Sequence, residues 1–255
     1  MPIEINKVYC CDSKIGMQEL INQGIKVDLI ITDPPYDMPC MKPGGKSRIA
    51  DRLRKEMNEL EEAKLNLGIS NDYLELMVKL QDKINIYIFC NGKQIEQYLD
   101  FFVKKHKCKY DILIWNKTNA MPCYSNKYLT DKEYVLYFRK GGLCNPRCYE
   151  DAKTVYQSSL NAIDKKRYGH PTIKPLPFII KMVKNSSMEG DLILDPFAGS
   201  GTTLVASKIL DRNFIGFEIE QKYVDICNQR LQEKGIVEWW GSSGWTWAGG
   251  YIQRR

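Results

Sequence analysis

Short runs of apolar, often β-branched residues recur along the chain and predict seven strands. They lie at residues 6–11, 27–32, 85–90, 110–115, 133–139, 191–195 and 213–218. Apolar positions at helical spacing predict helices between most of these runs, at residues 13–22, 92–105, 175–187, 201–210 and 221–235. Because strands and helices alternate, we expect an α/β fold with a mostly parallel seven-stranded sheet and helices on both faces.

Two segments are longer than the connections that such a sheet needs. Residues 39–66 begin as a loop with Gly, Pro and Lys and continue as a densely charged predicted helix, whereas residues 141–170 mix Asn, Tyr, Arg and Lys with little periodicity. Both follow strand ends, where sheets of this kind bind their ligands. We therefore predict one domain over residues 1–238 that carries both segments.

The last segment, residues 239–255, has a different composition. It holds four of the five tryptophans, set among glycines and serines. An aromatic binding tail and a peripheral extension without a role in chemistry both fit this composition, and we expect the second.

Length and composition indicate one large globular domain. A chain of 255 residues, with 44% apolar and 27% charged residues, can bury a full core. No apolar run approaches the roughly 20 residues of a membrane span, and the N-terminal residues lack the layout of a signal peptide. The nine cysteines include no Cys-x-x-Cys pair, so we expect free thiols, no metal site and a cytoplasmic location.

Positive charge is concentrated in the middle of the chain. The net charge is +6, but residues 101–174 alone hold 15 Lys and Arg against 6 Asp and Glu. A basic segment of this kind favours a polyanionic partner such as nucleic acid, although an ordinary solvated surface has the same signature.

The sequence Asp33-Pro34-Pro35-Tyr36 follows the predicted strand at residues 27–32. The prolines have a fixed φ and make the chain leave the strand along one stiff path. Asp33 is thereby held at the strand tip, where its carboxylate and the Pro34 carbonyl can accept both hydrogens of an exocyclic amine. Tyr36 can stack on the ring that carries this amine. The alternative is a plain Pro-Pro turn.

A second strand-end sequence, Asp195-Pro196-Phe197-Ala198-Gly199-Ser200-Gly201-Thr202-Thr203, turns sharply into a predicted helix. It is typical of the βα turn of a nucleotide-binding sheet. A phosphate loop would need a lysine after Gly201, and the dinucleotide fingerprint would need a small residue where Leu204 stands. A carboxylate at the strand end, from Asp195, suits an ammonium ligand better than a pyrophosphate.

Two further elements flank this glycine loop. Glu218 ends the predicted strand at residues 213–218, where an acidic residue commonly binds a ribose diol, and a solvated glutamate is the alternative. The sequence His170-Pro171-Thr172-Ile173-Lys174-Pro175 precedes the helix that leads to the loop. We expect a structural or cofactor-side role for His170 rather than catalysis. Lys174 is suited to an anionic group such as a carboxylate, with a solvated surface lysine as the alternative.

Together, these motifs resemble those of the DNA amino-methyltransferases that use S-adenosylmethionine. The resemblance covers residues 5–235 and rests on Asp-Pro-Pro-Tyr, His-Pro-Thr-x-Lys-Pro and Asp-Pro-Phe-x-Gly-Ser-Gly-Thr, which occur in the family's order. That order is similar to the circularly permuted β group, with the catalytic half before the cofactor half. The resemblance implies a Rossmann-like methyltransferase fold and double-stranded DNA as the substrate.

The resemblance also implies roles for single residues. Asp33, Pro34, Pro35 and Tyr36 would form the catalytic site for the amine of a flipped base. S-adenosylmethionine would contact the glycine-loop residues Asp195, Pro196, Phe197, Gly199, Ser200, Gly201 and Thr202. Glu218 would hold its ribose, Lys174 would lie on the cofactor side, and Asp12 would lie near its adenine.

Asp33, rather than Ser, at the first position of the tetrapeptide resembles N6-adenine more than N4-cytosine enzymes. We therefore predict methyl transfer to the N6 amine of a flipped adenine in DNA. N4-cytosine methylation is the alternative, and a catalytically silent DNA-binding protein is the alternative from a different class. The segment at residues 141–168 is shorter than the recognition region of many family members. Either the insert at 39–66 shares in recognition, or the sequence specificity is relaxed. The resemblance is compatible with a homodimer and with a partner restriction nuclease.

Overall fold

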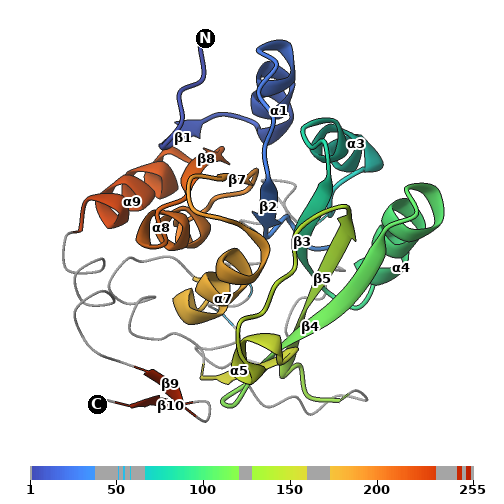
Figure 1. Ribbon diagram of the computed structural model, residues 1–255, viewed down its shortest axis with the longest axis vertical. Helices are drawn as coiled ribbons and strands as arrows, with labels where there is room; N and C mark the ends of the chain where they lie inside the picture. The colour runs from blue at the N-terminus through green and yellow to red at the C-terminus, as the bar shows by residue number, and fades with distance from the viewer. Residues whose placement is uncertain are drawn as a thin grey trace.

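Eight strands form one mixed sheet in the computed structural model (Figure 1). The structure describes residues 2–37, 67–120, 128–159 and 173–233, three isolated residues between 51 and 58, and two short strands near the C-terminus. The sheet consists of β1 (Lys7–Cys10), β2 (Leu29–Thr32), β3 (Ile84–Cys90), β4 (Lys109–Lys117), β5 (Lys132–Lys140), β6 (Val155–Ser158), β7 (Leu192–Asp195) and β8 (Asn213–Glu218). Their order is β1-β8-β7-β2-β3-β5-β4-β6.

The predicted α/β sheet is confirmed, but its predicted number of strands is wrong. All seven predicted strands are present, within two residues at each end. The eighth strand, β6, pairs in parallel with β4 at the sheet edge. It escaped prediction because its four residues contain no apolar run: Tyr156 is buried, whereas Val155 is half exposed and polar residues follow.

Helices cover both faces of the sheet. One face packs against α1 (Ser13–Asn22), α3 (Asn71–Lys79), α4 (Gln94–Tyr98) and the π-helical segment η1 (Leu99–Lys105). The other packs against α7 (Leu176–Ser186) and α8 (Thr202–Ile209), with α9 (Gln221–Gln232) beside α8 (Figure 1). Successive residues of β2 alternate between the two cores, with Ile30 in the first and Leu29 and Ile31 in the second. Burial on both faces explains why β2 and β3 are apolar without interruption.

The order in which the chain adds strands to the sheet changes direction between β2 and β7. These strands are parallel neighbours, with Leu29 opposite Ile193. From β7 the chain crosses through α8 to β8 on one side, and from β2 it reaches β3 on the other. At such a switch point the two outgoing loops separate and leave a crevice at the carboxyl ends of the strands, where ligands of open α/β sheets bind.

The remaining described elements are small. A short helix, α5 (Tyr149–Ala152), precedes β6, and an antiparallel pair, β9 (Thr246–Ala248) and β10 (Tyr251–Gln253), lies in the tail. Most of the predicted insert at 39–66 and residues 160–170 of the predicted recognition segment lie outside the described residues. Within the described chain, no helix combines the length and apolarity of a membrane span.

Candidate active site

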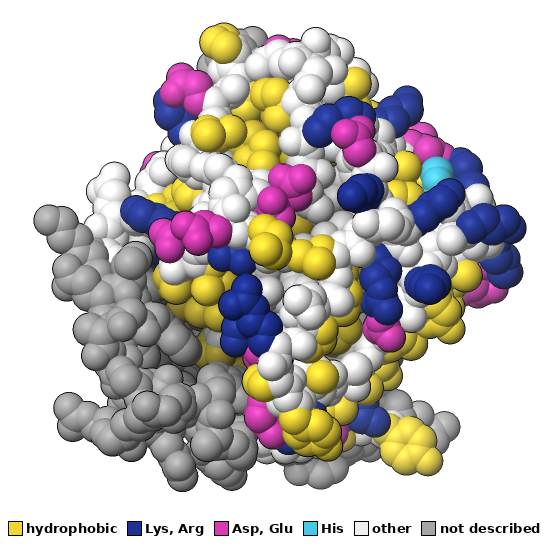
Figure 2. Space-filling view, in the orientation of Figure 1, with side chains coloured by type: hydrophobic (Ala, Val, Ile, Leu, Met, Phe, Trp, Pro, Cys, Tyr) yellow, Lys and Arg dark blue, Asp and Glu magenta, His cyan; other side chains and the backbone are white. Residues whose placement is uncertain are grey.

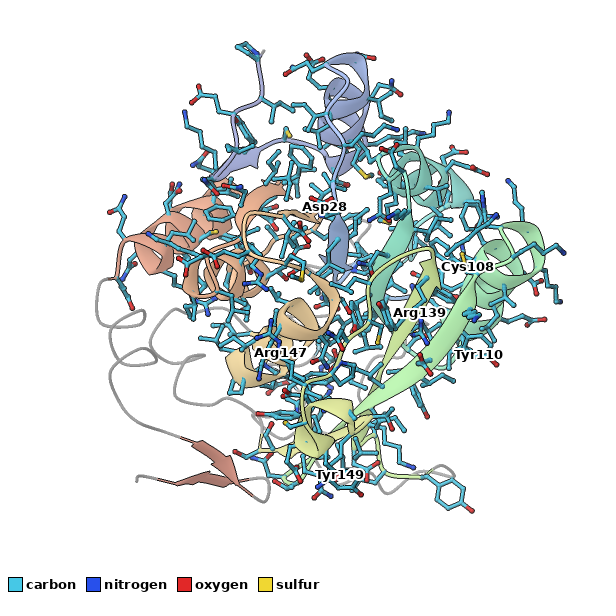
Figure 3. All side chains as sticks on the ribbon, in the orientation of Figure 1. Asp28, Cys108, Tyr110, Arg139, Arg147 and Tyr149 are labelled. Atoms are coloured by element: carbon cyan, nitrogen blue, oxygen red, sulfur yellow. The ribbon has the colours of Figure 1, made fainter. Side chains whose placement is uncertain are left out.

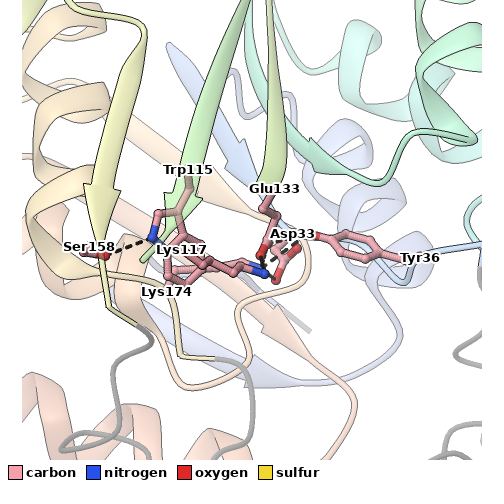
Figure 4. Close-up of polar contacts among 7 residues, drawn as sticks. All are labelled: Asp33, Tyr36, Trp115, Lys117, Glu133, Ser158 and Lys174. Carbon is pink, nitrogen blue, oxygen red and sulfur yellow. Dashed lines mark hydrogen bonds and ion pairs between the residues drawn. The ribbon is translucent and has the colours of Figure 1, made fainter. Parts of the chain in front are cut away.

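The Asp33 carboxyl group lies at the tip of β2, at the mouth of the crevice. Its Oδ2 is 2.8 Å from the ammonium nitrogen of Lys174 (Figure 4). Its Oδ1 is buried and has no hydrogen-bond partner among the residues that the structure describes. Burial raises the pKa of Asp33, the Lys174 charge opposes this effect, and the nearby Glu133 carboxylate adds to it. A buried acceptor without a donor is rare in folded proteins and indicates a position for a ligand donor.

The two proline carbonyls next to Asp33 differ in their bonding. The Pro35 carbonyl accepts a hydrogen bond of 3.1 Å from Gln94 Nε2. Within the described residues, no hydrogen bond reaches the carbonyl of Pro34. Asp33 and Pro34 therefore offer two neighbouring acceptors, as the sequence predicts for the grip on an amine.

Lys174 precedes α7 and is almost fully buried beside Asp33. Its ammonium group contacts Asp33 Oδ2, Glu133 Oε1 and, at 3.4 Å, the hydroxyl of Tyr36. Burial alone would lower the pKa of Lys174, but the two carboxylates outweigh it and raise the pKa above its usual range. Lys174 therefore stays charged, and its three N–H donors point at groups of this chain.

Glu133 was not among the predicted site residues. It is the second residue of β5, which runs antiparallel to β3 and β4, so the beginning of β5 lies at the carboxyl edge of its neighbours. Its carboxylate accepts from Lys174 and, at 2.7 Å, from Lys117 at the end of β4. Burial opposes ionisation, yet the two ammonium groups lower the pKa of Glu133 to about 2. The sequence signal for Glu133 is its place as a charged residue at the start of a predicted apolar strand.

Tyr36 is anchored by its hydroxyl group. The hydroxyl donates a hydrogen bond of 2.7 Å to Glu133 Oε1, and the ring centroid is 5.5 Å from Lys174 Nζ. Burial and the carboxylates of Asp33 and Glu133 raise the pKa of Tyr36 well above its usual value. The phenol is therefore a permanent donor that holds the ring beside Asp33.

Across the crevice, Asp195 ends β7 with its carboxyl group almost fully buried. Burial raises its pKa to about 7, against the hydrogen bonds that it accepts from the Thr203 side chain and from the backbone N–H of Phe197. A cation in the crevice would favour the ionised form of this group.

The glycine loop depends on two residues with positive φ. Gly199 has a φ of 51° and Gly201 a φ of 78°. A Cβ atom on Gly201 would lie 2.2 Å from Cys227 Sγ of α9. Only glycine fits the backbone conformation and the close approach together.

A buried arginine of α9 supports the same loop. Arg230 Nη1 donates to the Ser200 carbonyl at 2.6 Å, to Ser200 Oγ at 3.1 Å and to Thr202 Oγ1 at 3.1 Å. Arg230 was not predicted, because nothing in the sequence of an amphipathic helix distinguishes it from a solvated arginine. Arg230 therefore connects the glycine loop to α9, which packs behind the loop.

Glu218 and Asp12 both lie at carboxyl ends of strands, as predicted, and both bond to backbone N–H groups. Glu218 Oε2 accepts from Gly199 at 2.8 Å, and its Oε1 accepts from Glu220 at 2.9 Å. Asp12 caps α1, since its Oδ1 accepts from the N–H groups of Lys14 and Ile15. Each carboxylate retains lone pairs for a further donor.

A crevice that is partly open to solvent joins the two motifs. Its walls combine the β2 tip and Lys174 with the glycine loop. The lining residues are Thr32, Asp33, Phe89, Lys174, Ile179, Asp195, Phe197, Ala198, Gly199, Ser200, Thr202 and Thr203. Seven of the predicted site residues are thus brought together, whereas residues 170–172 lie outside the described chain.

The described basic residues of the segment 101–174 lie at both ends of the strands, some beside the crevice and some at the opposite ends. Lys109 begins β4 and lies opposite Arg139 near the end of β5, at the strand ends away from the crevice. Figure 3 labels Arg139. Figure 2 shows basic side chains over η1 on the same side. Several are ion-paired: Lys104 with Asp100, Lys105 with Glu75 and Arg139 with Asp111. This part of the charge does not face the crevice.

Comparisons with known proteins identify the family. The family model described as DNA methylase, of the N6/N4 methyltransferase type, matches residues 27–229. The chain belongs to this family. This DNA methylase is 27% identical to the type II methyltransferase M2.MboI of Moraxella bovis over 228 residues, which cover 83% of the chain and 82% of the relative. It is 30% identical to M.HinfI of Haemophilus influenzae over 245 residues, 81% of the chain and 63% of the relative.

Solved structures agree with this assignment. The M1.HpyAVI–SAM complex is similar to the DNA methylase with a TM-score of 0.67 and 28% identity, over 89% of this chain and 99% of that one. The PvuII cytosine-N4-specific DNA methyltransferase has a TM-score of 0.60 at 14% identity, which shows a shared fold. The DNA methylase therefore uses S-adenosylmethionine to methylate an amino group of DNA, as enzymes of restriction-modification do.

The crevice fits S-adenosylmethionine. The buried Asp195 carboxylate suits a cationic ligand, and Phe197 offers an apolar surface beside it. Gly199 and Gly201 bring the backbone close to the crevice without a side chain, at the N-terminus of α8. An amino-acid ammonium needs acceptors such as this carboxylate, and a sulfonium can lie against an apolar wall.

Proposed function

We propose that this DNA methylase methylates the N6 amine of an adenine that is flipped out of double-stranded DNA. The observation that carries the proposal is the buried Oδ1 of Asp33, which lacks a partner among the described residues and lies across the crevice from Asp195. An exocyclic amine has two hydrogens to donate. Asp33 Oδ1 and the Pro34 carbonyl would accept one each.

These two acceptors would be the protein's main contribution to the reaction. The lone pair of an aromatic amine is delocalised into the ring, so the nitrogen is a poor nucleophile. Two acceptors on one side favour a more tetrahedral nitrogen and direct its lone pair across the crevice. When bound, S-adenosylmethionine supplies an electrophilic methyl group on a sulfonium. The extra proton of the methylated amine can then pass to water.

The remaining predicted residues divide between base and cofactor. Tyr36, anchored on Glu133, would stack on the ring of the base, because a flipped base is commonly held by its aromatic face. The glycine loop and Asp195 would hold the methionine end of the cofactor, Glu218 its ribose and Asp12 the region of its adenine.

Adenine is preferred over cytosine because Asp33, rather than Ser, opens the tetrapeptide, as in the N6-adenine enzymes that the chain resembles. N4-cytosine methylation is the second candidate, since the same fold occurs in the PvuII cytosine-N4-specific methyltransferase. The exposed Lys132, at the start of β5 on the crevice side, would contribute a phosphate contact. DNA affinity should then fall as salt rises. A homodimer and a partner nuclease stay predictions.

The test is methyl incorporation into DNA from labelled S-adenosylmethionine. Asp33→Ala removes the acceptor and should abolish incorporation. Asp37→Ala is the matched control: Asp37 is exposed, follows in the same loop and contributes no crevice atom, so it should leave the rate near that of the wild type. Full incorporation by Asp33→Ala would refute the site, and none by the wild type would favour the silent DNA-binding protein.

A further inference from the structure

The buried ammonium group of Lys174 bonds to the amine-binding side of the crevice. Its partners are Asp33 on β2, Glu133 on β5 and the Tyr36 hydroxyl, and Phe89 lies below it with its ring centroid 4.9 Å away. An ammonium group has three N–H donors. All three are therefore directed at groups of this chain that lie on the amine-binding side of the crevice.

Lys174 determines which oxygen of Asp33 is available. The ammonium group occupies Oδ2 at 2.8 Å, whereas Oδ1 is without a partner among the described residues. The ion pair fixes the rotation of the carboxylate, because rotation of the group would move Oδ2 away from the Lys174 ammonium group and break the ion pair. The free oxygen consequently stays at the crevice.

The charges around Asp33 make this contact important. The groups that act on it from the elements packed around it are mainly acidic or neutral: Glu133 on β5, Asp195 on β7, Tyr36 in its own loop, Cys90 on β3 and Tyr98 on α4. Lys174 is the cation in contact with Asp33 within the described chain, and Lys117 pairs with Glu133 instead. Burial and the acidic neighbours favour the protonated form of Asp33, and Lys174 favours the ionised form.

We propose that Lys174, held by Glu133, is a positioning residue that keeps Asp33 ionised and turns Oδ1 toward the target amine. This inference rests on the role proposed for Asp33. The ionised carboxylate accepts hydrogen bonds with both oxygens, whereas the protonated group presents a donor at one of them. The rate of methyl transfer should therefore rise with the fraction of Asp33 that is ionised.

Two substitutions should move the pH dependence in opposite directions. Lys174→Met removes the cation, so the acid limb of the pH–rate profile should shift toward alkaline pH by about one unit or more, the usual effect of an adjacent charge on a carboxyl group. Glu133→Gln keeps an acceptor for Lys174 and Tyr36 but removes a negative charge beside Asp33, so the limb should shift toward acid pH. Lys174→Arg keeps the charge and should leave the limb near its wild-type position.

The controls separate positioning from a general loss of structure. Lys181→Met is the matched variant, because Lys181 is a buried lysine of α7 whose ammonium group bonds to the carbonyls of Glu150 and Lys153. It should lower stability without moving the acid limb. If Lys174 had only a structural role, Lys174→Met would also leave the acid limb in place and lower the rate by the same factor at every pH.

A direct readout does not depend on methylation. The protein labelled with ¹³C at aspartate carboxyl groups would be titrated by NMR, with the Asp33 signal assigned by its loss in Asp33→Asn. The Asp33 midpoint should rise in Lys174→Met and fall in Glu133→Gln. An unchanged midpoint in Lys174→Met would overturn the inference, even if Asp33→Ala abolishes incorporation. A raised midpoint, together with full incorporation by Asp33→Ala, would instead refute the proposed function.

Discussion

The Tyr36 hydroxyl donates a 2.7 Å hydrogen bond to Glu133, which joins the loop after β2 to the start of β5. This bond separates two contributions of Tyr36, since the ring and the hydroxyl can be removed one at a time. The ring would stack on the base, whereas the hydroxyl holds the ring in place.

Tyr36→Phe should therefore cost mainly stability and Tyr36→Ala mainly catalysis. Loss of a hydrogen bond to a charged group should lower the free energy of unfolding by about 1.5–3 kcal/mol in the Phe variant. Loss of the ring in Tyr36→Ala should lower kcat/KM for DNA by a further factor of about 5 to 150, the range for base–aromatic stacking. Steady-state kinetics on both variants check this, and equal kcat/KM values would show that the ring does not contact the base.

The glycine loop should not tolerate a methyl group at Gly201. Gly201→Ala introduces a positive-φ alanine, which costs roughly 1–2 kcal/mol, and a clash with Cys227 Sγ at 2.2 Å. Gly24→Ala is the matched control, because Gly24 has a φ of 68° and open space around its Cβ position. Denaturant unfolding should show a larger loss for Gly201→Ala, and adding Cys227→Ala should recover part of it. Equal losses at the two glycines would contradict the packing described for the loop.

Asp195 should make the protein less stable as pH rises from about 4 to about 7. Its pKa is about 7 in the folded state and about 4 in an unfolded chain. Between these values the folded state binds a proton that the unfolded state has released, so the free energy of unfolding falls with pH, by up to about 4 kcal/mol in total. Asp195→Asn removes this contribution, and its stability should rise relative to the wild type across the window.

Denaturant unfolding of both proteins at several pH values tests the effect. Parallel curves for wild type and Asp195→Asn would show that Asp195 titrates normally. Binding of a cation beside Asp195 should also lower its pKa. Calorimetry in buffers of different ionisation enthalpy should therefore detect proton release when S-adenosylmethionine binds near pH 7.

Local sequence was sufficient to predict both motifs and seven of the eight strands of the main sheet. β2 and β3 gave the clearest signal, because burial on both faces demands uninterrupted apolar residues. Asp33 follows β2 and Asp195 ends β7, and because these strands are parallel neighbours both residues lie at the same ends of the strands. Glu133 and Arg230 could not be predicted in the same way. Glu133 reaches the site because β5 runs antiparallel, and Arg230 because α9 packs behind the glycine loop. Both depend on contacts between segments far apart in the sequence.

The identity of the methylated base tests the central claim most directly. DNA incubated with the enzyme and isotope-labelled S-adenosylmethionine would be digested to nucleosides and examined by mass spectrometry. The mechanism predicts labelled N6-methyladenine from the wild type and none above background from Asp33→Ala. Labelled N4-methylcytosine without N6-methyladenine would contradict the adenine assignment, and N6-methyladenine at wild-type levels from Asp33→Ala would contradict the site.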